Sequence, residues 1–118
     1  MRFMLIHYIN EALLRFDEDG NEIEDPDEER ALDAWDDEMK ARGILVGGGR
    51  LRPVAETITI QARGGGVLKT DGPFAETKEQ IAGYCVLECA NVDEAVEVSS
   101  RHPTASIGTF ELRPYKAD

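Results

Sequence analysis

The stretch Ile81-Ala82-Gly83-Tyr84-Cys85-Val86-Leu87-Glu88-Cys89-Ala90-Asn91-Val92-Asp93-Glu94 decides the fold that this sequence predicts. Residues 81–89 are mainly apolar and have the length of a strand. Asn91, with Glu94 three residues later, is the capping arrangement that begins a helix, and Pro103 ends that helix. A second strand-like run covers 107–112. This part of the chain therefore predicts a strand, a helix and another strand.

The N-terminal part of the chain predicts the same order. Residues 3–9 have the composition of a strand. Asp25-Pro26-Asp27-Glu28 places an N-cap acid, a proline at the first helical position and a glutamate three residues after the cap. The helix that begins there ends at Gly43, before a short strand over 44–46. Its apolar stripe consists of Leu32, Trp35 and Met39.

Two glycine clusters punctuate the middle of the chain. Gly64-Gly65-Gly66 separates the strand-like runs 57–61 and 67–70 and predicts a hairpin. Gly47-Gly48-Gly49 has neither a following Gly-Lys-Ser/Thr nor dinucleotide-binding spacing, so it predicts a bend or bulge rather than a phosphate loop.

Together these elements predict a single α+β domain over 1–118, a ferredoxin-like βαβ–βαβ sandwich with an extra central β-hairpin. Right-handed crossovers place both helices on one face of the sheet, and an acidic loop over 17–25 lies between the first strand and the first helix. Met4 and Ile6 are apolar on the alternation opposite to Phe3 and Leu5, so the second face also needs cover. We therefore expect a homodimer that pairs through this sheet face.

Charge excludes several partner classes. The 118 residues include 24 acidic and 13 basic side chains, for a net charge of -11, which disfavours nucleic acid and anionic membrane surfaces. The N-terminus has strand rather than signal-peptide character, and no apolar run approaches the ~18 residues of a membrane span. We therefore expect a cytoplasmic protein. Cys85 and Cys89 would lie about 13 Å apart in a strand, too far for a disulfide, and we expect both to be buried and reduced.

Two carboxylates are the candidate acid–base groups. Asp71 precedes Gly72-Pro73, and a stiff turn gives its carboxylate a fixed direction, although Asp before Gly also commonly bonds its own turn. Glu79 would share the core face of the strand over 81–89 if that strand were regular back to this point. A later strand start, or a bulge at Gly83, would instead leave Glu79 solvated.

Other polar side chains have both a structural and a binding interpretation. His7 alternates with apolar residues of the first strand, which favours a core histidine over a catalytic base. His102 follows the second helix, where an imidazolium would suit the helix dipole, and we expect it to cap that helix. Two histidines this far apart in sequence do not form a metal motif, so we predict no metal and no cofactor. Lys78, Tyr84 and Arg113 are candidate ligand-binding groups, or otherwise surface and interface residues.

The segment from Asp71 to Gln80, which begins Asp71-Gly72-Pro73-Phe74, resembles the signature of the YCII-related, or DGPF-domain, family. The similarity extends to Gly83-Tyr84, Trp35, Met39, Gly43-Ile44-Leu45, Leu51-Arg52-Pro53 and Glu111-Leu112-Arg113-Pro114. The resemblance implies a bacterial, cytoplasmic protein with a dimeric α/β-barrel-like fold and a pocket between sheet and helices. Members of the wider family are proposed to use a His and Asp dyad whose histidine belongs to the first helix. That helix has no histidine here, so the dyad is not carried over.

Two functions follow as hypotheses. The first is a dimer that binds a small organic molecule in a pocket between sheet and helices. The aromatic lining of this pocket would be Trp35, Phe74 and Tyr84, and its charged groups would be Asp71, Lys78 and Glu79. His7 and Arg113 are further candidate binding residues. The alternative is a cofactor-independent enzyme that uses Asp71 or Glu79 as general acid or base. A third interpretation makes the acidic loop 17–25 a docking element for a basic protein.

Overall fold

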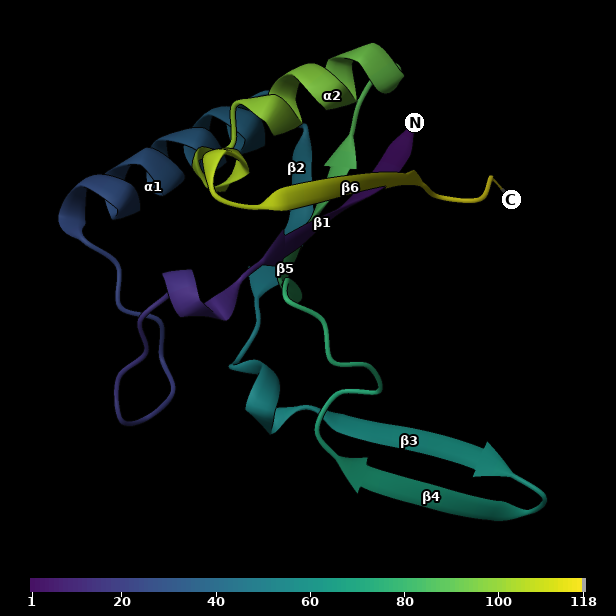
Figure 1. The fold of residues 1–118 in the computed structure, drawn as a ribbon. Helices are drawn as coiled ribbons and strands as arrows, with labels where there is room; N and C mark the ends of the chain where they lie inside the picture. Colours follow the sequence, from purple (N-terminus) through teal and green to yellow (C-terminus); the bar gives the residue numbers. More distant parts are fainter. Residues whose placement is uncertain (118) are drawn as a thin grey trace.

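A computed structural model describes residues 1–117 and contains six strands, two α-helices and three short 3-10 helices (Figure 1). In chain order the elements are β1 (Arg2–Ile9), η1 (Glu11–Leu13), α1 (Pro26–Ala41), β2 (Leu45–Arg50), η2 (Val54–Glu56), β3 (Ile58–Arg63), β4 (Gly66–Asp71), β5 (Gln80–Glu88), α2 (Val92–Ser100), η3 (Pro103–Ser106) and β6 (Thr109–Pro114). None of the helices within this range is long and apolar enough to span a membrane.

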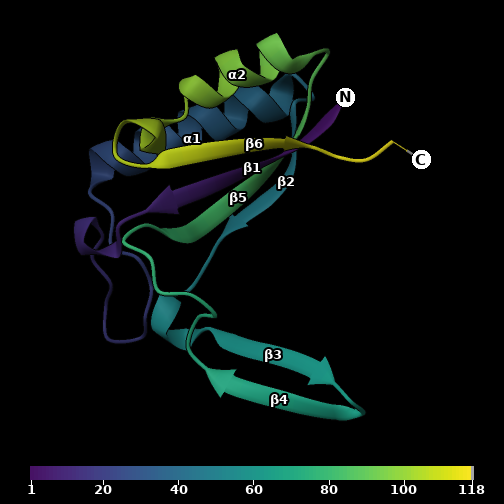
Figure 2. The same cartoon turned by 45° about the vertical axis from the view of Figure 1, so that its right-hand side comes forward.

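The main sheet has four strands in the order β2-β5-β1-β6, and each neighbouring pair is antiparallel. Both α-helices cover the same face of this sheet (Figures 1 and 2). The predicted α+β class and the placement of the helices are confirmed. The expected residues begin the helices, because Asp25 accepts a bond from the Glu28 N–H and Asn91 accepts one from the Glu94 N–H.

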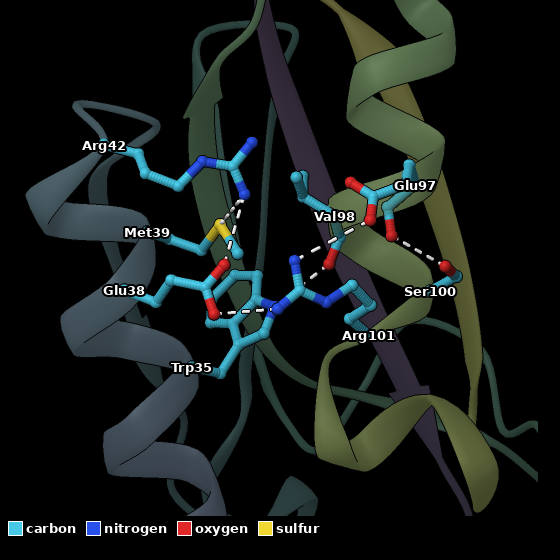
Figure 3. A network of polar contacts seen from close by, with 8 residues as sticks. All are labelled: Trp35, Glu38, Met39, Arg42, Glu97, Val98, Ser100 and Arg101. Atoms are coloured by element: carbon cyan, nitrogen blue, oxygen red, sulfur yellow. Dashed lines mark hydrogen bonds and ion pairs between the residues drawn. The ribbon is translucent and has the colours of Figure 1, made fainter.

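The core lies between the helices and the inward face of β1 and β5. Its fully buried side chains include Phe3, Leu5, Met39, Leu87 and Val98. Trp35 joins the two helices, because its indole N–H donates to the Val98 carbonyl of α2 at 3.0 Å (Figure 3). The predicted inward stripe of α1 is thus confirmed for Trp35 and Met39, and Leu32 is half-buried beside them.

The predicted central hairpin is also present, as a separate two-stranded sheet of β3 and β4 that projects away from the main sheet (Figures 1 and 2). Gly64 and Gly65 form its turn with positive φ of 59° and 79°, a conformation that glycine adopts without strain. Apolar side chains of the hairpin are exposed; they include Ile58, Ile60, Val67 and Leu68.

Two irregularities in the main sheet determine which side chains face the core. The β2–β5 register shifts between Leu45 and Gly47, which confirms the predicted irregularity in the first glycine cluster. Gly48 has φ +142°, and a Cβ there would meet the Tyr84 carbonyl oxygen at 2.5 Å, so only glycine permits this approach. The β1–β5 register shifts between His7, which pairs with Gly83, and Tyr8, which pairs with Ile81. This register shift corresponds to the expected alternative in which a bulge near Gly83 interrupts the regular strand before Glu79.

Candidate functional site

A cavity of about 760 Å³ lies between α1, the β2–β5 edge of the sheet and the segment that connects β1 to α1. Its lining includes side chains of 9–16, 22–25 and 102–107, one face of α1, and the backbone of 47–49. The glycines of 47–49 place bare backbone at this wall, so the bulge in β2 leaves room for the cavity.

Half of the acidic loop forms a wall of this cavity. Phe16 and Glu22 form an isolated antiparallel bridge, which folds the loop back on itself. Arg50 of β2 then contacts Glu22 at 3.2 Å and also contacts Glu24. Glu22 and Glu24 are half-buried, whereas Asp17 in the same loop is exposed. These ion pairs hold the loop against β2, and the loop is therefore a structural part of the cavity.

Three buried side chains from different parts of the sequence meet at the cavity: His7, Cys85 and His102, called here the His/Cys cluster. Their potential ligand atoms all lie within 4.8 Å of one another, and Cys85 Sγ is 3.6 Å from His7 Nε2. His7 stacks on Phe110 with ring centroids 4.5 Å apart. The prediction that His7 points into packed surface is confirmed.

Burial keeps the cluster uncharged near neutral pH. It lowers the pKa of His7 to about 4. The pKa of His102 falls to about 3, again mainly through burial, with smaller contributions from the nearby His7 and Arg50. Burial raises the pKa of the Cys85 thiol to about 12. Two neutral imidazoles and a thiol can therefore donate and accept hydrogen bonds here, but the free thiol is a poor nucleophile.

His102 caps a helix as expected, but the helix is η3 rather than α2. The side chain is not an imidazolium at the end of α2, because it is buried and its Nδ1 accepts the Thr104 N–H at 3.1 Å, which caps η3. It also contacts Trp35 edge-on, with ring centroids 4.7 Å apart. The sequence did contain a signal for this role, because His102-Pro103 has the same order of cap and proline as Asp25-Pro26.

The predicted site residues divide into several groups. His7 and Tyr84 line the cavity, and Trp35 lies behind it against His102. Asp71 ends β4 on the projecting hairpin and is exposed, and Phe74 is 81% exposed. Within one chain, Asp71 and Phe74 therefore lie outside the cavity.

The remaining candidates, Glu79, Lys78 and Arg113, also lie outside the cavity. Glu79 is half-buried and accepts a hydrogen bond from the Thr109 hydroxyl at 3.0 Å. Lys78 lines a second, shallow hollow together with Glu79 and Tyr8. Arg113 is exposed on β6, opposite Met4 of β1.

Sequence reasoning missed several residues at the cavity. Cys85 is expected from sequence only as a buried, reduced thiol, and Asp36 and Lys40 are not among the candidate site residues, yet all three line the cavity. Partial burial raises the pKa of Asp36, with the neighbouring Lys40 acting in the opposite direction. An i, i+4 pair on one helix face is the sequence signal that relates these two side chains.

Comparisons with known proteins agree with this fold. Residues 1–117 match the YCII-related domain. An uncharacterized protein, R00369, of Rhizobium meliloti (strain 1021) is 35% identical over 106 residues, which cover 74% of this chain and 84% of that protein. The structure of 5-chloro-2-hydroxyhydroquinone dehydrochlorinase from Burkholderia phenoliruptrix AC1100, in complex with 2,5-dihydroxybenzoquinone, covers 100% of this chain and 96% of its own, with a TM-score of 0.51 and 16% identity. The extent of the domain match and the identity to the Rhizobium protein show that this chain belongs to the YCII-related domain family.

Proposed function

We propose that this protein binds a small organic molecule in the cavity between α1 and the β2–β5 edge of the sheet. The observation that carries the proposal is the cavity itself, whose volume of about 760 Å³ is in the range of small-molecule sites, roughly 300–1,000 Å³. Its lining combines apolar side chains with a few polar groups, as ligand sites do. Leu32 and Ile9 supply apolar surface, and His7 and His102 supply buried polar atoms.

The polar groups favour a ligand with hydroxyl or carbonyl oxygens. His7 can donate one hydrogen bond and accept another, whereas His102, whose Nδ1 already accepts the Thr104 N–H, can only donate from Nε2. Asp36 and Lys40 add a carboxylate and an ammonium group at the α1 wall. The dehydrochlorinase complex holds a dihydroxylated quinone, so we take 2,5-dihydroxybenzoquinone as the first probe.

The second candidate function is a cofactor-independent enzyme that uses Asp71 or Glu79 as general acid or base. The structural similarity to the dehydrochlorinase supports testing catalysis. Asp71 is on the projecting hairpin, so it would reach the cavity only if the hairpin of one copy packed against another copy. Glu79 would act from the second hollow, beside Lys78.

We also propose the homodimer on which that arrangement depends, in the ferredoxin-like, dimeric-barrel arrangement expected from sequence. The sheet face opposite the helices carries the half-buried apolar side chains Met4, Ile6 and Val86. A second copy on this face would bury them. Light scattering on the purified chain tests this, with a mass of twice 13.1 kDa as the expected result. The two free cysteines support the cytoplasmic location that we predict.

Calorimetry with 2,5-dihydroxybenzoquinone and with hydroquinone tests the binding proposal. We expect saturable binding by the wild-type chain and at least tenfold weaker binding by Leu32→Trp, which fills the cavity from α1. Val96→Trp is the matched control, because it adds the same ring to an exposed position of α2 outside the cavity lining, and we expect it to bind normally. If Leu32→Trp, still folded by circular dichroism, binds both probes as well as the wild type, the ligand does not occupy this cavity.

Carboxylate variants separate the enzyme hypothesis from simple binding. An enzyme of the proposed kind consumes a probe, whereas a binding protein returns it unchanged, as followed by the absorbance of the quinone. Loss of turnover in Asp71→Asn or Glu79→Gln, with unchanged binding, would favour the enzyme. Turnover that is the same in the wild type and both variants would remove these carboxylates from consideration.

A further inference from the structure

The His/Cys cluster has the composition and spacing of an incomplete transition-metal site. A zinc ion holds sulfur at about 2.3 Å and nitrogen at about 2.0–2.1 Å in tetrahedral geometry, which places such ligand atoms about 3.6 Å apart. Cys85 Sγ and His7 Nε2 are separated by 3.6 Å, and His102 supplies a third ligand atom within 4.8 Å of both. We propose that His7, Cys85 and His102 bind a borderline-soft divalent ion of the zinc class beside the cavity. This goes beyond the proposed function and does not depend on it.

The donor set selects the class of ion. Two imidazoles and one thiolate suit zinc and its neighbours in the first transition row, whereas magnesium and calcium prefer oxygen ligands. Three protein ligands leave one position of a tetrahedral ion open. Because all three side chains line the cavity, that position would be available to a water or to a ligand oxygen.

Rigid elements already hold two of the three ligands. The strands β1 and β5 are hydrogen-bonded to each other, and His7 pairs with Gly83 while Leu5 pairs with Cys85. His7 and Cys85 are therefore diagonal neighbours, displaced by two positions in the register. Gly83 keeps the space beside His7 open, since a Cβ there would approach His7 Nδ1 to 3.7 Å and the Gly49 carbonyl oxygen to 2.9 Å. Phe110 stacks on His7 and lies edge-on to His102, and these contacts restrict both rings.

Binding the ion requires two local changes. The Cys85 S–H bond breaks, an S–metal bond forms, and one proton per ion leaves for solvent. His102 Nδ1 accepts the Thr104 N–H at 3.1 Å, so the proton of this neutral imidazole is on Nε2. Coordination through Nδ1 replaces that hydrogen bond, and coordination through Nε2 moves the proton to Nδ1 and also breaks it. In both cases η3 loses its cap, and the ion replaces it as the constraint on His102.

The absorbance of bound Co²⁺ provides the test. Its visible bands depend on the coordination geometry of the ion, and a thiolate ligand adds a charge-transfer band. The 118-residue chain is freed of metal with a chelator and titrated with Co²⁺, and bound metal is then counted after zinc displacement. We expect one ion per chain, a tetrahedral spectrum and a thiolate-to-cobalt charge-transfer band. Mg²⁺ in excess should not displace the cobalt.

Two cysteine variants assign the sulfur. In Cys89→Ala the cluster is intact and Cys85 is the only thiol left, so the thiolate band must persist. In Cys85→Ala the band must vanish and cobalt affinity must fall at least tenfold. Cys89→Ala keeps the proposal falsifiable even if Cys85→Ala fails to fold.

Three results would overturn the proposal: no bound cobalt, binding without a thiolate band, or a band that is lost in Cys89→Ala. The second would place the ion away from the Cys85 thiolate, and exposed carboxylates are abundant alternatives in a chain with net charge -11. Since this readout uses no organic ligand, a failure here is distinct from a failure of the small-molecule proposal.

Discussion

Replacing Trp35 by Phe tests whether one buried hydrogen bond ties α1 to α2. The indole N–H donates to the Val98 carbonyl at 3.0 Å from a side chain that is 4% exposed (Figure 3). Losing this bond costs about 1 kcal/mol. The Val98 carbonyl still accepts the Arg101 N–H at 3.3 Å, so the full penalty for an unpaired buried group does not apply.

The smaller ring adds a packing cost. Phenyl lacks three ring atoms of indole, the nitrogen and two carbons, and at about 0.8 kcal/mol for each buried carbon the packing loss is roughly 1–2 kcal/mol. The expected decrease in the free energy of unfolding is therefore about 2–3 kcal/mol. Urea unfolding, followed by far-ultraviolet circular dichroism, measures this decrease at a fixed protein concentration. Circular dichroism is used because Trp35 is the only tryptophan, so the variant has no tryptophan fluorescence.

Glu38→Gln is the matched control at the same helix–helix contact. Glu38 accepts from Arg42 at 3.2 Å and from Arg101 at 2.7 Å, but these pairs are open to solvent (Figure 3). Solvent screens such pairs, so we expect a much smaller effect than for Trp35→Phe. A loss below about 1 kcal/mol for Trp35→Phe, or a larger loss for Glu38→Gln, would refute the reasoning that the buried bond dominates this contact.

Three further predictions concern the cavity. Gly83→Ala should lower the melting temperature markedly, because the new Cβ would lie 2.9 Å from the Gly49 carbonyl oxygen. Gly49→Ala is the control and should be tolerated, because its Cβ would meet no atom within 4 Å. Equal decreases in melting temperature for the two variants would contradict the close approach at Gly83. Arg50→Ala should increase hydrogen exchange in the loop over 17–25 while α1 stays protected, and unchanged exchange would show that the ion pairs do not hold the loop. The pKa values of His7 and His102 are about 4 and about 3 in the folded chain, against 6.5 in the unfolded chain. Between these values the unfolded chain binds more protons, so the free energy of unfolding decreases as the pH falls from about 6.5 toward 4. At pH 5 the loss is about 2 kcal/mol for each histidine relative to pH 7, and chelator-treated His7→Gln and His102→Gln should each show a correspondingly weaker pH dependence in urea unfolding.

Local signals in the sequence determined the secondary structure. Asp25-Pro26 and Asn91 with Glu94 begin the helices because their side chains satisfy the free N–H groups of a first turn, and this chemistry needs no distant partner. Gly64-Gly65 forms the hairpin turn because glycine alone accepts both positive φ values without strain. The alternation along β1 likewise placed Phe3, Leu5 and His7 on the covered face.

The candidate site could not be predicted in this way. His7, Cys85 and His102 come from β1, β5 and the start of η3, and only the pairing of β1 with β5 and the packing of η3 against α1 bring them within 4.8 Å. A one-residue register shift at His7/Tyr8 changed which side of the sheet Glu79 could face, and composition does not encode such a shift. The sequence by itself determined the elements and the inward faces, because periodicity and caps act over a few residues. Tertiary structure decided the cavity and its buried histidines, because their pKa values and contacts depend on burial by segments that are distant in the chain.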